Sequence, residues 1–204
     1  MTSVDDAGFV TRFFYVYSME VSVSTPPQRI CVYCGSKRGK KNRHRESAIT
    51  LGHEMARRGI GLIYGGGHVG LMGDLATAVM DAAGHVTGVI PRALMDRELG
   101  HEGVTELLVV DDMHERKATM ARDADAFIAL AGGYGTLEEL FEVVAWAQLD
   151  IHDRPVGLLN TNGYYDHLLQ FLDSSVDAGF LRTHHRNLLK VAENPIALLD
   201  ELIS

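Results

Sequence analysis

Short apolar runs alternate with segments of helical pattern over most of this chain, and that alternation limits the folds open to it. We expect strands at residues 29–34, 61–64, 86–90, 106–110, 127–131, 155–159 and 188–191. Helical segments separate them, the first ending near residue 58 and the others covering 71–83, 113–124, 135–149, 164–178 and 195–203. Strand and helix in turn, joined by short links, predict a parallel sheet with helices on both faces. Because such crossovers are right-handed, we expect a single-domain, Rossmann-like, doubly wound α/β fold over residues 28–204.

Length and charge narrow the classes of function. The 204 residues suffice for one domain with a substantial core. A net charge of −8 argues against a protein that coats nucleic acid, and no apolar run approaches the roughly 20 residues needed to cross a membrane. Residues 1–27 show no clear period and are expected to form an arm outside the fold.

Both cysteines fall in the first expected strand, as Cys31 and Cys34. Side chains three positions apart on a strand point to opposite faces, so a redox pair is not favoured. Two cysteines also fall short of a disulfide framework, which fits a cytoplasmic protein.

A glycine-rich loop joins the apolar run at 127–131 to the helical segment after it. Three glycines within residues 132–135 leave backbone N–H groups directed at one point at the positive end of a helix, which favours a phosphate. Two carboxylates, Glu138 and Glu139, follow at once. The spacing from Thr136 to Glu139 also fits a capping box, in which Thr136 caps the helix and Glu139 reaches back. Local sequence leaves both interpretations of Glu139 open.

A second glycine motif has the form Gly65-x-Gly67-x-x-Gly70. It fits a dinucleotide fingerprint, but the next strand ends at Arg92 and lacks the carboxylate that would hold a ribose hydroxyl. A simpler phosphate or nucleotide contact is therefore favoured. Ligands of such sheets bind beyond the carboxyl ends of the strands. The residues after four strand ends are therefore expected to converge on one site: Ser36, the triplet Gly65, Gly66 and Gly67, the loop 92–98 and the loop 132–135.

Two basic residues, Arg116 and Lys117, stand near the start of the helical segment 113–124. Positive charge is unfavourable there, so the pair indicates either a bound anion or two side chains that project into water. The basic stretch 37–45 likewise has two interpretations: a solvated loop, or positive charge above a phosphate. The ten histidines form no metal-binding pattern, so no metal site is expected.

Several of these motifs in this order resemble the LONELY GUY (LOG) family of cytokinin riboside 5′-monophosphate phosphoribohydrolases, once misnamed lysine decarboxylases. The resemblance runs from about residue 29 to the end of the chain. It includes Met113-His-x-Arg-Lys117, Gly132-Gly-Tyr-Gly-Thr-Leu-Glu-Glu139, Tyr64-Gly-Gly-Gly-x-x-Gly-Leu-Met-Gly73 and Trp146-Ala-Gln-Leu149. One departure is Ala131, where the family usually has a proline that pre-sets the backbone.

The resemblance implies hydrolysis of the N-glycosidic bond of a nucleoside 5′-monophosphate, giving free base and ribose 5-phosphate without a cofactor. By match to the family, Glu139 is the catalytic carboxylate and Arg116 its essential partner. The matching substrate-binding positions are Glu98, Lys117, Gly132, Gly133, Tyr134, Gly135, Thr136, Leu137 and Glu138. A homodimer is also implied, and the segment 137–149 agrees because it is apolar around most of its circumference.

Two other functions stay open at this point: a non-catalytic carrier and an NADP-dependent reductase, whose nicotinamide binding we expect to be absent. A non-catalytic carrier of a nucleotide or of molybdenum cofactor would need the phosphate-binding loop but not the pair Arg116 and Glu139. A pyridoxal-dependent decarboxylase needs a Schiff-base lysine and a much larger fold, whereas this chain has five lysines in 204 residues. We reject the decarboxylase.

Overall fold

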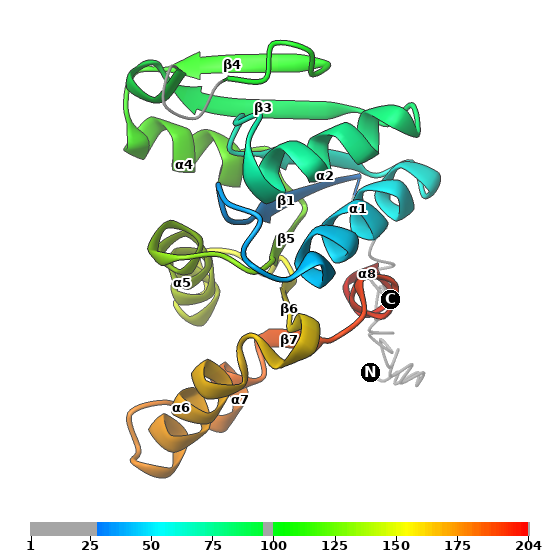
Figure 1. The fold of residues 1–204 in the computed structure, drawn as a ribbon. Coiled ribbons are helices and arrows are strands. Elements are labelled where there is room, and N and C mark those ends of the chain that lie inside the picture. Colours follow the sequence, from blue (N-terminus) through cyan, green and yellow to red (C-terminus); the bar gives the residue numbers. More distant parts are fainter. Residues whose placement is uncertain (1–27, 96–99, 204) are drawn as a thin grey trace, which may run out of the picture.

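Seven parallel strands form one sheet in the part of the chain that the structure describes, residues 28–95 and 100–203 of a computed structural model (Figure 1). The order across the sheet is β4-β3-β2-β1-β5-β6-β7. The expected arm at 1–27 and the predicted contact Glu98 lie outside the described residues. The strand bounds are β1 (Arg29–Tyr33), β2 (Gly61–Tyr64), β3 (Val86–Pro91), β4 (Glu106–Val110), β5 (Ala126–Ala129), β6 (Val156–Leu159) and β7 (Leu189–Ala192).

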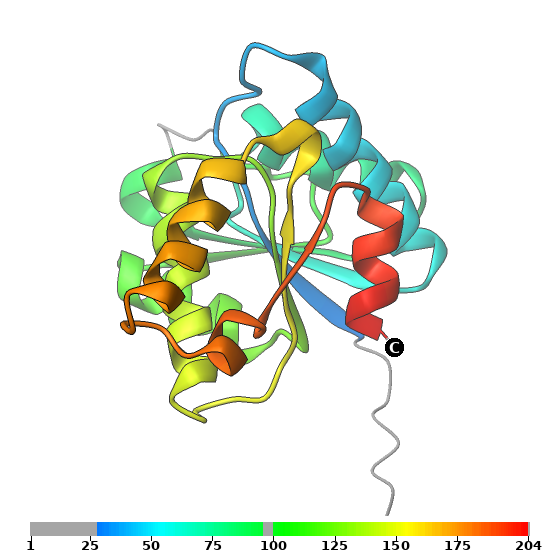
Figure 2. The ribbon, with the colours of Figure 1, turned by 90° about the horizontal axis from the view of Figure 1, so that it is seen from below.

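Helices cover both faces of the sheet, as Figure 2 shows. One face packs against α1 (Asn42–Arg57), α2 (Gly70–Asp81) and α8 (Pro195–Ile203). The other packs against α4 (Met113–Arg122), α5 (Tyr134–Gln148) and α6 (Asp166–Asp177). The shorter elements are η1 (Arg92–Leu94), η2 (Thr161–Gly163) and α7 (Thr183–Arg186). The predicted doubly wound α/β fold is therefore confirmed.

The two cysteines lie in different cores. Cys31 packs among the residues under α4 and α5, whereas Cys34 packs among those under α1 and α2. Both are buried free thiols, and burial raises the pKa of each well above its usual range. The prediction that they point to opposite faces is confirmed, and neither is placed to react with the other.

The chain reverses its direction of travel across the sheet between β1 and β5. From β1 it runs outward through β2 and β3 to β4, then returns to place β5 on the other side of β1. The loops after β1 and β5 therefore leave the sheet side by side, and the N–H of Gly35 donates to the carbonyl of Ala131 at 3.0 Å. Ligands of open α/β sheets bind at such a reversal point. No helix in the described residues is long and apolar enough to span a membrane.

Candidate active site

The loop after β5 leads directly into α5, which starts earlier than the capping-box interpretation requires. Gly133 is the N-cap, Tyr134 is the first helical residue, and no side chain caps the helix. Thr136 therefore lies inside the first turn, so the capping box from Thr136 to Glu139 is wrong. Gly133 has no side chain that could accept from the first-turn N–H groups, so the N-cap leaves them to a ligand, as the phosphate interpretation requires.

Thr136 instead supports the loop from beneath. Its side chain is buried, and a Cβ at residue 132 would lie only 2.0 Å from its Oγ1. Only glycine at 132 leaves room for the Thr136 side chain to lie against the backbone there. The pair Gly132 and Thr136 therefore holds the loop close to α5.

Helix α4 has a strong N-terminal cap. The carboxylate of Asp112 accepts from the backbone N–H groups of His114 and Glu115 at 2.8 and 2.9 Å. The bond from Glu115 contributes most to holding the pKa of Asp112 below its usual value. This cap fixes the turn from which Arg116 projects.

Arg116 is buried, with only 5% of its surface exposed. Its Nε donates to the carbonyl of Val89 at 3.1 Å, and its Nη2 donates to the carbonyl of Gly65 at 2.7 Å. A Cβ at residue 65 would lie 2.0 Å from Nη2, so glycine there is what lets the guanidinium approach. Arg116 thus does not project into water, and the ends of β2 and β3 hold it in place.

Lys117 turns toward α5. Its ammonium contacts the carboxylate of Glu138 and donates to that of Glu142 at 3.0 Å, with 13% of the side chain exposed. The predicted contacts Lys117 and Glu138 are thus bound to each other here. This ion-pair cluster ties the helix that carries Arg116 to the helix that carries Glu139.

A cavity of about 320 Å³ opens at the reversal point and receives both predicted catalytic residues. Arg116 enters it from α4 and the half-buried Glu139 from α5. The other predicted residues that line it are Ser36, Gly65, Gly133, Tyr134, Gly135, Thr136 and Glu138. Gly66, Gly67, Lys117, Gly132 and Leu137 do not line this cavity. Most of the predicted site is therefore brought together, with the second glycine motif contributing a single residue.

Apolar side chains that the sequence analysis did not select line the same cavity: Met72, Leu94, Met113 and Met120. Met113 and Met120 stand three residues before and four residues after Arg116, so all three share one face of α4. That helical spacing is the sequence signal from which Met113 and Met120 could have been selected as site residues. The cavity therefore joins a charged region to an apolar region.

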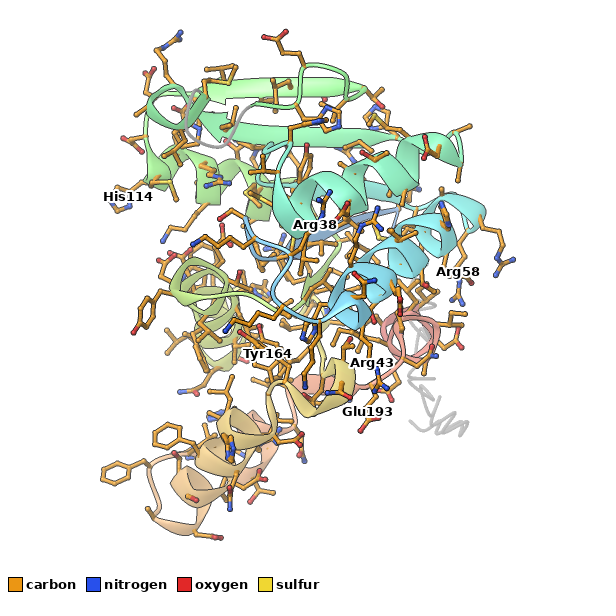
Figure 3. All side chains as sticks on the ribbon, in the orientation of Figure 1. Arg38, Arg43, Arg58, His114, Tyr164 and Glu193 are labelled. Carbon is orange, nitrogen blue, oxygen red and sulfur yellow. The ribbon has the colours of Figure 1, made fainter. Side chains whose placement is uncertain are left out.

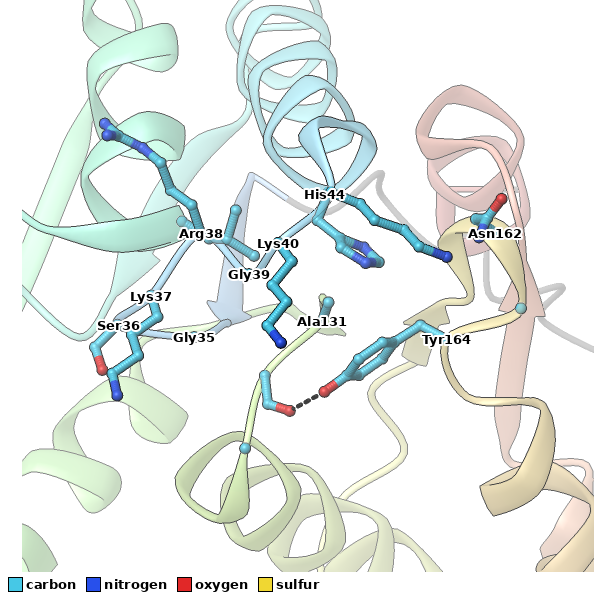
Figure 4. A pocket seen from close by; sticks show the side chains of 15 residues that line it. Gly35, Ser36, Lys37, Arg38, Gly39, Lys40, His44, Ala131, Asn162 and Tyr164 are labelled. Carbon is cyan, nitrogen blue, oxygen red and sulfur yellow. Dashed lines mark hydrogen bonds between the residues drawn. The ribbon is translucent and has the colours of Figure 1, made fainter.

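A second cavity, of about 600 Å³, adjoins the first (Figure 4). The loop from β1 to α1 forms one wall, the stretch Ala131–Gly133 another, and the end of η2 a third. The hydroxyl of Tyr164 donates to the carbonyl of Gly132 at 2.7 Å across its base. Gly35, Ser36 and Gly133 line both cavities.

The N-terminus of α2 is not open to a dinucleotide. The N–H of Leu71 donates to the carbonyl of Gly35 at 3.0 Å, and a Cβ at Gly70 would lie 2.2 Å from the backbone of Ser36. The loop after β1 thus occupies the place where a pyrophosphate would bind in a dinucleotide fold. Among the described residues, no group of three or more histidine, cysteine or acidic side chains is placed to hold a metal ion.

Comparison with known proteins agrees with this geometry. The family described as "Possible lysine decarboxylase" matches residues 72–202. A probable cytokinin riboside 5′-monophosphate phosphoribohydrolase of Oryza sativa subsp. japonica is 56% identical over 175 residues, covering 86% of this chain and 72% of the relative. A cytokinin riboside 5′-monophosphate phosphoribohydrolase of Arabidopsis thaliana is 56% identical over 174 residues, covering 85% of this chain and 81% of the relative.

Among solved structures, a molybdenum cofactor carrier protein of Chlamydomonas reinhardtii is similar with a TM-score of 0.63 and 26% identity. The match covers 87% of this chain and 98% of the carrier. The fold is thus shared with carriers, but the sequence is much closer to the phosphoribohydrolases. This chain belongs to the LONELY GUY family, whose curated members include those phosphoribohydrolases.

Proposed function

We propose that this protein hydrolyses the N-glycosidic bond of cytokinin riboside 5′-monophosphates, and of AMP, to free base and ribose 5-phosphate. One observation carries the proposal: Arg116 and Glu139 enter one cavity beside the uncapped first turn of α5. Relatives that are 56% identical and named as phosphoribohydrolases support it.

The 5′-phosphate is assigned to the start of α5. The N–H groups of the first turn have no side-chain cap, and the helix dipole makes that end positive. Gly133 and Gly135 would each have open space around an added Cβ, so a phosphate can reach the backbone there. Ser36, in the loop after β1, lines the same cavity and supplies a hydroxyl.

The bond to be broken then lies between Glu139 and Arg116. As the bond from C1′ to the base nitrogen breaks, its electron pair leaves with the base and positive charge develops on the ribose. The carboxylate of Glu139 stabilises that charge and takes a proton from the water whose oxygen bonds to C1′. The departing base nitrogen then gains that proton, which releases the neutral base and restores the carboxylate. Arg116, fixed by two backbone carbonyls, holds positive charge at the site where the base gathers negative charge.

The base is assigned to the apolar part of the cavity. Met72, Met113 and Met120 present flexible thioether side chains, which adapt to the face of a planar ring. An N6 substituent would extend this apolar contact. This arrangement supports adenine-type substrates.

The runner-up function is a non-catalytic carrier, favoured by the likeness to the molybdenum cofactor carrier of Chlamydomonas reinhardtii. A carrier needs the phosphate-binding loop alone. Replacement of Glu139 by glutamine separates the two, since it abolishes turnover in an enzyme and leaves a carrier's ligand binding intact.

We also propose that the protein acts as a cytoplasmic homodimer. Within one subunit, α5 buries only Thr136, Leu140 and Val143, although most of its surface is apolar. Tyr134 at its start is 94% exposed and Leu149 after its end is 66% exposed. A second copy that packs on α5 would cover this surface. Light scattering tests the dimer, and a monomer would contradict it.

The activity is tested with a panel of nucleoside 5′-monophosphates that differ only at N6. Purified protein is incubated with isopentenyladenosine 5′-monophosphate and with AMP, and free base and ribose 5-phosphate are quantified. We expect equal amounts of both products. A folded protein that releases neither product from any member of the panel would overturn the proposed function.

A further inference from the structure

The second cavity combines an apolar and glycine-rich base with a set of basic side chains. Its lining includes Lys37, Lys40, Lys41 and His44 from the loop and helix after β1, facing Asn162 and Tyr164. No carboxylate is among the described residues that line it. In Figure 4 the ammonium of Lys40 points across the cavity toward Ala131 and Tyr164.

Two arginines of the same basic stretch are already engaged elsewhere. Arg38 and Arg45 both bind the carboxylate of Asp74 in α2, at 2.7 and 3.2 Å, and Figure 3 shows Arg38 beside that helix. Burial alone would raise the pKa of Asp74, but the bonds from the two arginines outweigh it and lower the pKa. This clamp anchors the loop. Arg43 is engaged as well, since it donates to the side-chain oxygen of Asn162 at 2.6 Å, and the three lysines are the remaining cations of the stretch that line the cavity.

The three lysines have no such partner. Among the described residues, neither Lys37, Lys40 nor Lys41 forms an ion pair with a carboxylate. Their charges make the electrostatic potential at the cavity more positive, which favours an anion there.

Helix α1 adds to the positive field. Lys41 is its N-cap but makes no side-chain cap, and no acidic residue lies in the first turn of this 16-residue helix. In that turn, Nδ1 of His44 is buried without a hydrogen-bond partner in the described residues. The His44 ring also meets the edge of the Tyr164 ring, 5.2 Å between centroids. Side-chain and backbone groups that an anion would satisfy therefore converge on the cavity.

The wall of the second cavity is continuous with the proposed 5′-phosphate site. Gly35, Ser36 and Gly133 line both cavities, so a phosphate on the first turn of α5 lies where the two meet. A further phosphate attached to it would extend toward Lys40.

We propose that the second cavity is a phosphate-binding site separate from the one that holds the 5′-phosphate. Its ligand is either the second phosphate of a nucleoside 5′-diphosphate or a free anion of the pyrophosphate type. The first form rests on the proposed nucleotide site; the second does not.

Calorimetry with ADP, AMP and pyrophosphate tests the proposal. The titrations use the full chain with Glu139→Gln, so that nucleotide is not consumed, with and without Lys40→Gln/Lys41→Gln. We expect ADP to bind about tenfold more tightly than AMP, as one or two added charge-assisted hydrogen bonds allow, and the double lysine variant to remove that difference. Lys190→Gln, on distant β7, is the matched control and should preserve it.

The remaining arms separate the two ligand sources. Pyrophosphate that binds in the presence of saturating ribose 5-phosphate, and depends on the lysines, identifies a free anion as the ligand. If the double lysine variant weakens binding of ADP but not of pyrophosphate, the ligand is the second phosphate of a nucleoside 5′-diphosphate. If neither ADP nor pyrophosphate binding depends on Lys40 and Lys41, the proposal is overturned. AMP hydrolysis by the wild-type protein is measured alongside, and its absence would overturn the proposed function while leaving the pyrophosphate comparison intact.

Discussion

Replacement of Gly65 by alanine tests whether the position of Arg116 matters for the reaction. The new Cβ would lie 2.0 Å from Nη2 of Arg116, 3.1 Å from its Cζ and 3.2 Å from Sδ of Met72. Ordinary contact starts at 3.4 Å, so the guanidinium must retreat by about 1.4 Å. Its bond to the carbonyl of Gly65, now 2.7 Å, would then lengthen beyond hydrogen-bonding range.

A displacement of about 1 Å in a catalytic group costs on the order of 100-fold in rate. We therefore expect kcat/KM of Gly65→Ala to fall about 100-fold, equivalent to about 2.7 kcal/mol of transition-state stabilisation. This agrees with the roughly 1.5–3 kcal/mol that a hydrogen bond to a charged group contributes.

The assay measures release of base from isopentenyladenosine 5′-monophosphate. Gly61→Ala is the control, because it makes the same change at the other end of β2, where the nearest atom is Cγ of Arg29 at 3.3 Å. If Gly65 acts through Arg116, then Gly65→Ala adds little further loss to Arg116→Ala. Wild-type activity in folded Gly65→Ala, or fully additive losses, would refute this reasoning.

Three further predictions follow from the structure. Lys117→Met leaves Glu138 and Glu142 facing each other without their shared cation. We expect the melting temperature to fall by about 2–8 °C, for a loss of roughly 1–2 kcal/mol, and an unchanged value would contradict the link between α4 and α5. Glu54 accepts hydrogen bonds from Arg57 and Arg58, of which the bond from Arg57 contributes most, and these bonds lower the pKa of Glu54 to about 2. The ionised carboxylate therefore stabilises the fold above pH 4.5, and this stabilisation is lost as the pH falls toward 2. Glu54→Gln should lower the melting temperature at about pH 7, and the difference from wild type should shrink over the same pH range. NADPH should show no change in its nicotinamide fluorescence on addition of protein, because the loop after β1 covers the start of α2. A saturable change would restore the dinucleotide interpretation.

The alternation of strands and helices was predictable because each strand here is short, apolar and buried. β5, for example, reads as an unbroken apolar run since both of its faces are covered. Sequence order also placed the loops after β1 and β5 at one edge of the sheet. The hydrogen-bond partners of Arg116 were not predictable, because they are the backbone carbonyl groups of Val89 and Gly65. Every residue has such a group, so no residue type signals the contact.

The start of α5 shows where a local pattern misleads. Thr136 and Glu139 have the spacing of a capping box, yet the helix starts three residues earlier, with Gly133 as its N-cap, and the buried Thr136 side chain packs against Gly132. Lys117 and Glu138 were both selected as substrate contacts, but they lie 21 residues apart and no sequence pattern shows that they pair. Such long-range contacts depend on how helices pack, which neither composition nor spacing contains. That Ala131 loosens the entry to the glycine loop stays a prediction. The observed contact at this residue, in which its carbonyl accepts from the N–H of Gly35, is one that a proline carbonyl could also make.

The central claim is that Glu139 acts on a nucleotide bound at the start of α5. It is tested by measuring, for Glu139→Gln, both base release from isopentenyladenosine 5′-monophosphate and binding of that nucleotide by calorimetry. Our account predicts loss of base release at least about 100-fold below wild type, as expected when a general acid–base group is removed, with nucleotide binding retained. Turnover that persists in this variant would contradict the assignment of Glu139.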